Sequence, residues 1–277
     1  MIKKTIKKTA KQVLPPFVSA LILKVTTKKS FADWHRIEGG GLTGREIFID
    51  GTLHKEFVEG TYDKFFFDYL SRLDLHGKTV FDIGAHIGFH AMTFAQLVGD
   101  AGSVRAFEPN TFNRERLQLN LTKNPDLAKR IELYDVAVSD CEGEIEFNFS
   151  SNVDDGRSSG SFISGSHTPS PGEFYETIGF NKVSIKTVSL DQVSASFGIQ
   201  DAPYLIKIDV EGAENLVLDG GVNLIRKYKP IILMEIHSIF NMLKTCEFFG
   251  SVDYEIELLK EENDGRCFIA ATAQNNQ

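Results

Sequence analysis

The hydrophobic positions of this chain change repeatedly from a period of about two to a period of about 3.6, which predicts strands alternating with helices. The clearest unit is a run of β-forming residues at 79–81 that ends near Asp82, a turn that contains two glycines, and apolar residues at helical spacing to residue 97. Repeated units of this kind predict a doubly wound α/β fold, with a mostly parallel sheet covered on both faces. Further strands are expected at residues 103–107, 131–138, 204–208 and 230–236, and further helices at 112–121, 213–227 and 239–249.

Residues 31–78 precede this alternation and predict a small flap followed by one helix. Residues 46–49 are β-like, and apolar side chains recur at helical spacing between residues 61 and 75 until Gly77, which is expected to end the helix. The chain therefore divides into three predicted segments. These are a basic amphipathic extension at 1–30, the flap and helix at 31–78, and a ligand-binding domain at 79–277.

The alternation is interrupted between about residues 140 and 190, where we expect an insertion. Residues 144–149 alternate Ile and Phe with polar residues, as in an antiparallel strand, and residues 183–188 predict the returning strand. Between them, residues 150–175 are rich in Ser, Gly, Asp and Pro, which predicts a long loop of the kind that often serves as a lid. The chain closes with an expected antiparallel pair at 254–259 and 266–271.

Composition is that of an ordinary globular protein, but the charge is distributed unevenly. The net charge is -8, yet residues 1–30 carry eight lysines and no acid, which leaves the remaining chain with 22 basic and 38 acidic residues, a net of -16. An acidic body argues against a nucleic-acid partner. The basic, partly apolar extension predicts either a solvated helix or peripheral contact with an anionic membrane surface.

The cysteines and the N-terminus both favour a cytoplasmic protein. Three cysteines without CxxC spacing predict reduced thiols, and no run of 18 apolar residues is present to span a membrane. The N-terminus resembles a signal peptide only superficially, because Pro15 and Pro16 interrupt it and Lys24 ends its apolar run early. The sequence does not predict the oligomeric state.

The turn after the first strand predicts the kind of ligand. A dinucleotide fingerprint needs a middle glycine where the backbone approaches a pyrophosphate, and His86 stands at that position between Gly84 and Gly88. Asp82 also places a carboxylate inside the turn, which disfavours a diphosphate and favours a cation. S-adenosylmethionine, which has a sulfonium and a free amino group but no phosphate, fits this turn best.

A second acid completes the predicted cofactor site. Glu108 ends the neighbouring strand, where its carboxylate can accept both ribose hydroxyls. The adenine is expected near Val136 and Ala137, where Asp135 is either a hydrogen-bond acceptor for the exocyclic amine or an ordinary surface residue. The adjoining residues of the two turns complete the predicted set of cofactor-binding residues: Ala85, His86 and Phe89 after the first strand, and Pro109 and Asn110 after the second.

Five segments together carry a family resemblance that covers roughly residues 55–240. They resemble the FkbM family of S-adenosylmethionine-dependent methyltransferases, although members of that family often carry Asn where His86 stands. The resemblance implies a class I methyltransferase fold, with seven strands of which the last is antiparallel. It also implies methyl transfer to oxygen, commonly on a sugar or a polyketide-type natural product. The segments are FDIGAHIGFH at 81–90, AFEPN at 106–110, VAVSD at 136–140, IKIDVEGAE at 206–214 and ILMEIH at 232–237.

The N-terminal extension carries a second resemblance. Its lysines, apolar residues and Pro15-Pro16 resemble family members associated with bacterial surface-polysaccharide synthesis. This implies a protein that works near the inner membrane on glycan intermediates.

The candidate catalytic residues lie at the ends of two later strands. Asp209 follows the strand expected beside the first one, so it is either the base that removes the acceptor proton or a contact to the methionine amino group. Glu211 could orient Asp209 or bind acceptor hydroxyls, and His237, oriented by Glu235, could act as base near neutral pH. Lys207, inside the strand, is expected to extend its amine toward solvent or to pair with an acid.

Two questions remain open from the residues alone. Asp209, Glu211, Glu235 and His237 could also hold a divalent cation, although our preferred assignment contains no metal. We expect an O-methyltransferase acting on a sugar, a glycan or a related small molecule. The alternatives are a nicotinamide-dependent sugar-nucleotide oxidoreductase and a catalytically inactive scaffold at the membrane.

Overall fold

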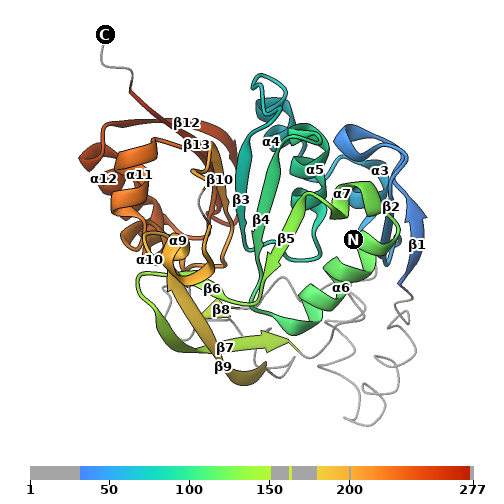
Figure 1. Ribbon diagram of the computed structural model, residues 1–277, viewed down its shortest axis with the longest axis horizontal. Helices are drawn as coiled ribbons and strands as arrows, with labels where there is room; N and C mark the ends of the chain where they lie inside the picture. Colours follow the sequence, from blue (N-terminus) through green and yellow to red (C-terminus); the bar gives the residue numbers. More distant parts are fainter. Residues whose placement is uncertain (1–31, 151–161, 164–179, 200, 275–277) are drawn as a thin grey trace, which may run out of the picture. The chain divides into compact units, whose positions relative to one another are not determined.

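A computed structural model of the chain describes residues 32–150, 162–163, 180–199 and 201–274. Its centre is a seven-stranded sheet in the order β12-β13-β11-β10-β3-β4-β5 (Figure 1). β13 is antiparallel to both of its neighbours, and the other paired strands are parallel. The expected fold class, a mostly parallel class I methyltransferase sheet, is therefore confirmed. The strands are β3 (Thr79–Ile83), β4 (Ser103–Phe107), β5 (Ile131–Tyr134), β10 (Leu205–Ile208), β11 (Ile231–Ile236), β12 (Tyr254–Glu261) and β13 (Cys267–Ala273).

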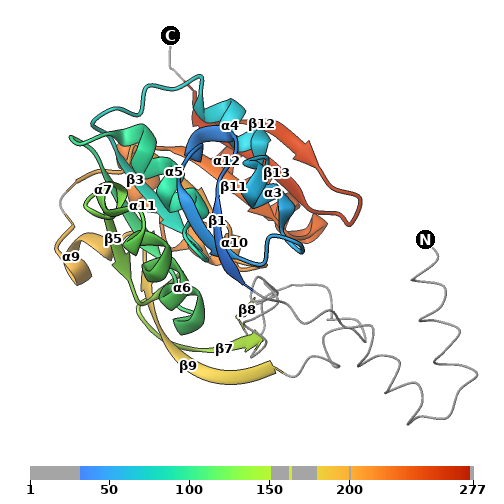
Figure 2. The same ribbon diagram turned by 90° about the vertical axis from the view of Figure 1, so that its right-hand side faces the viewer.

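Successive residues of the strands pack into two separate cores, one on each face of the sheet. In β3, Val80 belongs to one core and Phe81 to the other, because neighbouring side chains of a strand point to opposite faces. The first core is closed by α3 (Lys55–Glu59), α4 (Lys64–Leu70), α5 (Phe89–Val98) and α7 (Pro125–Ala128). The second is closed by α9 (Val193–Phe197), α10 (Glu214–Asp219), α11 (Val222–Tyr228) and α12 (Ile239–Ser251), which lie on the other side of the sheet in Figures 1 and 2.

Two smaller sheets flank the central one. β1 (Asp33–Arg36) and β2 (Glu46–Ile49) form an antiparallel hairpin, joined by η1 (Gly40–Leu42), and β2 packs against α6 (Thr111–Thr122). The second sheet has the order β6-β9-β7-β8 and lies at the carboxyl ends of β3, β4 and β5 (Figures 1 and 2). It consists of β6 (Ala137–Ser139), β7 (Gly143–Ser150), β8 (Phe162–Ile163) and β9 (Phe180–Ser189), so the expected antiparallel pair of the insertion is confirmed.

Three predicted elements differ from the structure. The strand expected at 131–138 is divided, because the chain leaves the central sheet after Tyr134 and β6 pairs with β9 instead. The helix expected at 213–227 is broken at Gly220, where an added Cβ would lie 2.1 Å from the carbonyl oxygen of Ser139. The helix expected at 61–75 is shorter, because Asp63 adopts a left-handed conformation (φ 45°) and α4 begins only after it.

Several expectations fall on parts of the chain that the structure does not describe. The basic extension at 1–30 lies outside the described residues, and so does the loop expected at 150–175 except for its first residue and β8. Within the described residues, no helix has the length and apolar character needed to cross a bilayer.

Candidate active site

The turn after β3 is shaped by glycines in the left-handed conformation. Gly84 has a φ of 79°, and a Cβ at this position would lie 1.8 Å from the carbonyl oxygen of Asp209. Gly88 has a φ of 88°, and its Cβ would lie 2.7 Å from the Cγ of Leu117. His86 between them also has a positive φ, 50°, which is uncommon for a residue with a side chain. Glycine is therefore required at position 84 because the backbone at the end of β10 approaches the turn, and not because a ligand does.

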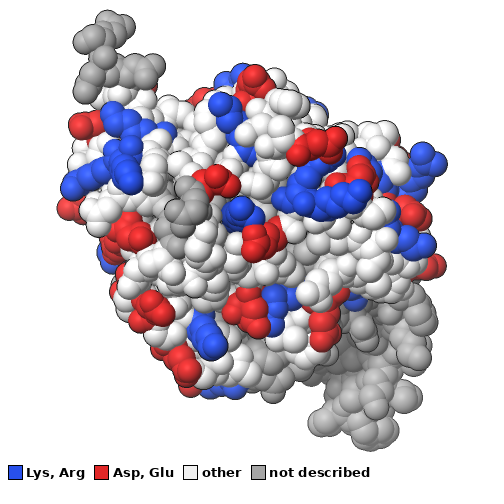
Figure 3. All heavy atoms as spheres, in the orientation of Figure 1, with Lys and Arg blue, Asp and Glu red and all other residues white. Residues whose placement is uncertain are grey.

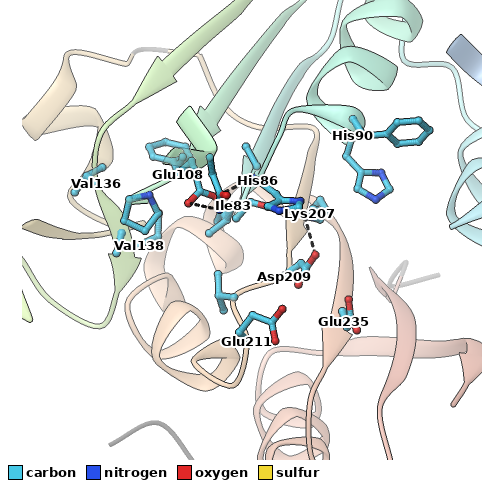
Figure 4. Close-up of a pocket in the computed structure, with 18 of the residues that line it drawn as sticks. Ile83, His86, His90, Glu108, Val136, Val138, Lys207, Asp209, Glu211 and Glu235 are labelled. Carbon is cyan, nitrogen blue, oxygen red and sulfur yellow. Dashed lines mark hydrogen bonds and ion pairs between the residues drawn. The ribbon is translucent and has the colours of Figure 1, made fainter. Parts of the chain in front are cut away.

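Glu108 at the end of β4 is buried and ties this turn to the next one. Its Oε2 accepts a hydrogen bond from the backbone N–H of His86 (2.8 Å; Figure 4). Its Oε1 accepts from the backbone N–H of Asn110 (2.9 Å) and from Nδ2 of Asn113 (3.3 Å). Burial raises the pKa of Glu108, and these three hydrogen bonds oppose the rise. Because a carboxylate oxygen can accept two hydrogen bonds, Oε2 keeps one acceptor position for a ligand.

The other predicted cofactor-binding residues are distributed around one cavity or lie outside it. Asn110 is not on the cavity wall, because its Oδ1 caps α6 by accepting from the backbone N–H of Phe112 (3.0 Å). Asp135 lies outside it too, with 77% of its side chain exposed and its Oδ2 3.3 Å from Arg114 Nη2. The predicted residues on the wall are Gly84, Ala85, His86, Phe89, Glu108, Pro109, Val136 and Ala137.

A buried lysine occupies the centre of the site. The Nζ of Lys207 donates to the carbonyl oxygen of Gly84 (2.9 Å) and lies 3.4 Å from Asp82 Oδ1. It lies 3.2 Å from Asp209 Oδ2, the contact drawn in Figure 4. The parallel register of β3 and β10 places Lys207 opposite Asp82. Asp82 is fully buried, and neither carboxylate oxygen has a hydrogen-bond partner in the described part of the chain. Of the two alternatives for Lys207, pairing with an acid is therefore confirmed.

Lys207 controls the protonation of its neighbours. Burial alone would lower the pKa of Lys207, but Asp209 and Asp82 outweigh it and raise that pKa. Burial alone would raise the pKa of Asp209, but Lys207 and His237 outweigh it and lower that pKa. Asp209 is therefore held as an anion.

Four carboxylates surround His237, and three of them line the cavity. The Nδ1–H of His237 donates to Glu214 Oε1 at 2.6 Å. This bond orients the ring, so that Nε2 faces away from Glu214. From Nε2 the nearest carboxylate oxygens are 3.4 Å away on Glu211, 3.5 Å on Glu235 and 3.9 Å on Asp209. In Figure 4 the carboxylates of Asp209, Glu211 and Glu235 face a common space. The four predicted catalytic residues are therefore brought together.

The charges of neighbouring groups raise the pKa values of Glu211, Glu235 and His237, and burial adds to the rise for the two acids but opposes it for His237. Burial, together with the charge of Asp209, raises the pKa of Glu211 to about 7 and that of Glu235 to about 8. Burial alone would lower the pKa of His237, but the hydrogen bond to Glu214 and the charges of Glu211 and Glu235 outweigh it and raise that pKa to about 10. At neutral pH the His237 ring is therefore an imidazolium.

The same atoms form a set that could hold a metal ion. One ligand atom each from Asp209, Glu211 and His237 lie within 4.8 Å of one another. Two carboxylate oxygens and one imidazole suit a divalent cation such as Mn²⁺ or Zn²⁺, and the Glu214 contact to the second ring nitrogen is typical of metal-bound histidine. Glu235, the fourth residue of the set expected from sequence, is instead bound to Arg266 Nη1 at 2.8 Å.

The remaining wall of the cavity comes mostly from residues that the sequence does not mark as site residues. Phe57 and Tyr62, from the segment before β3, line the same cavity as Asp209. They carried no local signal, since their aromatic rings fit the apolar pattern of core helices. His90 of α5, four positions after His86, is expected from the sequence to line the pocket or cap the helix; it does line the cavity, and its Nε2 donates to Asp63 Oδ2 at 3.0 Å. The cavity is also lined by Ile83, Phe107, Asn113, Val138, Phe147, Lys207, Val210 and Arg266.

Comparisons with known proteins agree with this geometry. The chain is 27% identical over 203 residues to the hexuronic acid methyltransferase AglP of Haloferax volcanii, a match that covers 71% of each protein. It is 30% identical over 185 residues to the 2-O-methyltransferase NoeI of Sinorhizobium fredii, which covers 64% of this chain and 73% of that protein. Neither similarity supports an oxidoreductase or an inactive scaffold.

A solved structure shows the same fold. The methyltransferase FkbM from Methylobacillus flagellatus superposes with a TM-score of 0.53 at 21% identity, over 74% of this chain. This chain covers only 46% of that longer protein. The profile of the methyltransferase FkbM domain matches residues 82–263, which is well over half of the chain and includes both the glycine turn and the carboxylate cluster. The chain is therefore a methyltransferase and belongs to the FkbM family.

Proposed function

We propose that the protein transfers a methyl group from S-adenosylmethionine to a hydroxyl of a sugar or glycan. One observation carries this proposal: the glycine turn and Glu108 line the same cavity as Asp209, Glu211 and Glu235. A cofactor held at the turn would therefore face a cluster of carboxylates across a short distance. The two relatives whose names specify a hexuronic acid and a 2-O position support a sugar hydroxyl as acceptor.

The charges of the cavity support S-adenosylmethionine over a dinucleotide. A sulfonium and an amino group are favourable beside the anion of Asp209 and the partly ionised Glu211, whereas a pyrophosphate would be repelled by them. Asp209 lines the cavity and is suited to the amino group of the cofactor, whereas Asp82 is fully buried behind the cavity wall and holds Lys207 beside Asp209. Glu108 would accept a ribose hydroxyl through the free position on Oε2.

Glu211 is the side chain best suited to remove the acceptor proton. When bound, the cofactor supplies an activated methyl group; the protein must align the hydroxyl and accept its proton. Lys207 keeps the pKa of Asp209 low, so the carboxylate of Asp209 is a weak base. His237 already carries a proton at neutral pH and cannot accept another. Glu211 lines the cavity with 30% of its side chain exposed, and its pKa of about 7 matches the working pH of a general base.

Binding and turnover measurements test this function together. Calorimetry with S-adenosylhomocysteine should show binding, NAD should show none, and Glu108→Ala should weaken the binding because the ribose acceptor is lost. Methyl transfer to a panel of sugars and lipid-linked glycans, followed by mass spectrometry, should identify the acceptor. Glu211→Gln should then lower kcat by about 10²-fold or more with little change in cofactor affinity. Failure of the wild type to bind S-adenosylhomocysteine would refute the function.

A metal-assisted version of the same reaction is the second candidate, and the ligand set of Asp209, Glu211 and His237 favours it. A divalent cation there would lower the pKa of an acceptor hydroxyl. Incubation with a chelator separates the two versions. If activity persists, Glu211 removes the acceptor proton without a metal ion. If activity is lost and then restored by added Mn²⁺ or Mg²⁺, a metal ion at this site assists the removal of that proton.

We also propose that the protein works in the cytoplasm, at the inner face of a membrane. The eight lysines of residues 1–30 support contact with anionic lipid. A glycan intermediate anchored in that membrane is then the natural partner. The acidic body supports the absence of nucleic acid among its partners.

A further inference from the structure

One wall of the active-site cavity is formed by residues that lie before the part of the chain matched by the family profile. Phe57 of α3 and Tyr62 line this wall, whereas the family match begins at Asp82. The cofactor turn and the carboxylates account for two other walls. The segment that contains Phe57 and Tyr62 therefore faces the space left for the acceptor.

The ring of Tyr62 is fixed by its packing. It stacks on Phe57 with ring centroids 3.9 Å apart and an interplanar angle of 18°. It also meets the ring of Phe89 edge to face, at 5.6 Å and 86°. Packing of this kind accounts for an aromatic ring at position 62, and a phenylalanine would satisfy it equally well. The hydroxyl needs a separate explanation.

The hydroxyl of Tyr62, a residue that lines the cavity, makes no hydrogen bond to any residue that the structure describes, and it is not among the fully buried polar atoms that lack a partner. Burial raises the pKa of Tyr62, and the negative charges of Asp63, Asp209, Glu235 and Glu211 raise it further. The hydroxyl therefore lies in the field of the catalytic carboxylates and remains a protonated donor. A ligand with an oxygen acceptor in the cavity would satisfy it.

The charges around this space define the chemistry of that ligand. Among the described residues of the cavity wall, the two permanent cations are already paired. Lys207 lies between Asp82 and Asp209, and Arg266 is bound to Glu235 and, at 2.9 Å, to Asp264. A sugar carboxylate or phosphate placed here would meet the anion of Asp209 and the partly ionised Glu211 and Glu235 without a free counter-ion, which is unfavourable at short range. Neutral hydroxyls are acceptable, because they can donate to carboxylates and accept from Tyr62.

We infer that the Tyr62 hydroxyl is the positioning group of an acceptor subsite, and that this subsite takes an uncharged sugar ring opposite Asp209, Glu211 and Glu235. This inference rests on the proposed sugar methylation and narrows its substrate class. The hydroxyl of Tyr62 donates to one sugar oxygen, and the carboxylates accept from neighbouring sugar hydroxyls. The preference for an uncharged ring differs from the hexuronic acid named for one relative.

The test uses full-length protein loaded with S-adenosylhomocysteine. Saturation-transfer NMR measures binding of methyl glucoside, methyl galactoside and methyl mannoside, each beside its uronic acid counterpart. We expect at least one neutral sugar to bind about tenfold or more tightly than its uronate. Tyr62→Phe, which keeps the ring packing, should weaken that binding by about three- to tenfold, as expected for one lost hydrogen bond. Calorimetry should show unchanged affinity for S-adenosylhomocysteine.

Tyr69→Phe is the matched control, because Tyr69 lies on α4, seven positions further along the chain, and does not line the cavity. It should leave sugar binding unchanged. A uronate that binds better than its neutral counterpart, equal binding by wild type and Tyr62→Phe, or no binding by any neutral sugar would each overturn the inference. Loss of S-adenosylhomocysteine binding by the wild type would instead refute the proposed function, so the two failures are distinguishable.

Once the acceptor is known, steady-state kinetics give a second readout. Tyr62→Phe should raise KM for the acceptor by about three- to tenfold. A merely structural role for Tyr62 would instead lower thermal stability or cofactor affinity and leave KM for the acceptor unchanged.

Discussion

Gly84 shows how one residue fixes the position of the active site. Its φ of 79° and the 1.8 Å contact that a Cβ would make with Asp209 both exclude larger residues. The contact partner is the backbone of the residue whose carboxylate enters the site. Because the turn after β3 and the end of β10 touch at this glycine, the cofactor side and the carboxylate side of the cavity are held at a defined separation.

We expect Gly84→Ala to reduce the free energy of unfolding by about 3 kcal/mol or more, because left-handed strain and a backbone clash act together. Gly198→Ala is the matched control. Gly198 also has a positive φ, 66°, but its added Cβ would meet no heavy atom within 4 Å among the described residues beyond its chain neighbours, so only strain of about 1–2 kcal/mol should appear. Urea unfolding measures both. Equal losses in the two variants would show that the clash at Asp209 is relieved without cost.

Lys207 is the second single residue that shapes the site, because it is a buried lysine paired with acids. A lysine inside an apolar strand is a signal that buried counter-charges exist, because an unpaired ammonium would be very costly there. The sequence could raise this possibility, but it could not say which acids are involved. The parallel register of β3 and β10 answers the question by placing Lys207 opposite Asp82.

At the scale of elements, the pair of Glu214 and His237 joins α10 to the end of β11. The ring of His237 titrates near pH 6.5 in an unfolded chain, whereas its pKa in the folded protein is raised to about 10. A group whose pKa is raised on folding contributes stability that is fully present below the unfolded pKa. That stability is lost as the pH rises through the folded pKa.

We therefore expect His237→Gln to be less stable than wild type at pH 6.5, and this difference to narrow progressively toward pH 10. The raised pKa values of Glu211 and Glu235 also make the wild type lose stability as the pH rises, chiefly below pH 8. Chemical unfolding at several pH values measures the difference, with the exposed His76→Gln as control. A difference that stays constant from pH 6.5 to pH 10 would contradict the raised pKa.

The elements also show which local sequence patterns were sufficient to predict the bounds of a strand or helix. β4 was predicted with its observed bounds, because an apolar run in a parallel strand is recognisable by itself. The division of residues 131–138 was not predictable, because it depends on where β9 offers a partner for β6. The break at Gly220 likewise arises from packing against Ser139, which no helical periodicity reveals.

At the scale of the whole molecule, the charges divide along the chain. On the face shown in Figure 3, basic and acidic side chains of the described residues are interspersed, without a continuous basic stripe. The concentrated positive charge lies in the sequence of residues 1–30. Electrostatic attraction of such a segment to anionic lipid contributes about 1 kcal/mol per lysine near the surface.

We expect the protein to sediment with vesicles of phosphatidylcholine and phosphatidylglycerol at low salt and to be released at high salt, because salt screens this attraction. Replacing Lys3, Lys4, Lys7 and Lys8 with glutamine should abolish most of the vesicle binding. The same replacement at four exposed lysines of the body, Lys55, Lys64, Lys129 and Lys227, should have little effect. Equal sedimentation of both variants would place membrane contact outside the extension.

The sequence by itself determined the fold class, the family and the residues of the glycine turn and the carboxylate cluster. It could do so because strand and helix periods are local, and because Asp82, Glu108 and Asp209 lie at the ends of recognisable strands. Only the tertiary structure decided how these groups act on one another. It placed Lys207 between two acids, turned His237 into a buried cation, and brought Tyr62 to the cavity from the segment before β3. These outcomes depend on distances between segments far apart in the chain, and no local pattern encodes such distances.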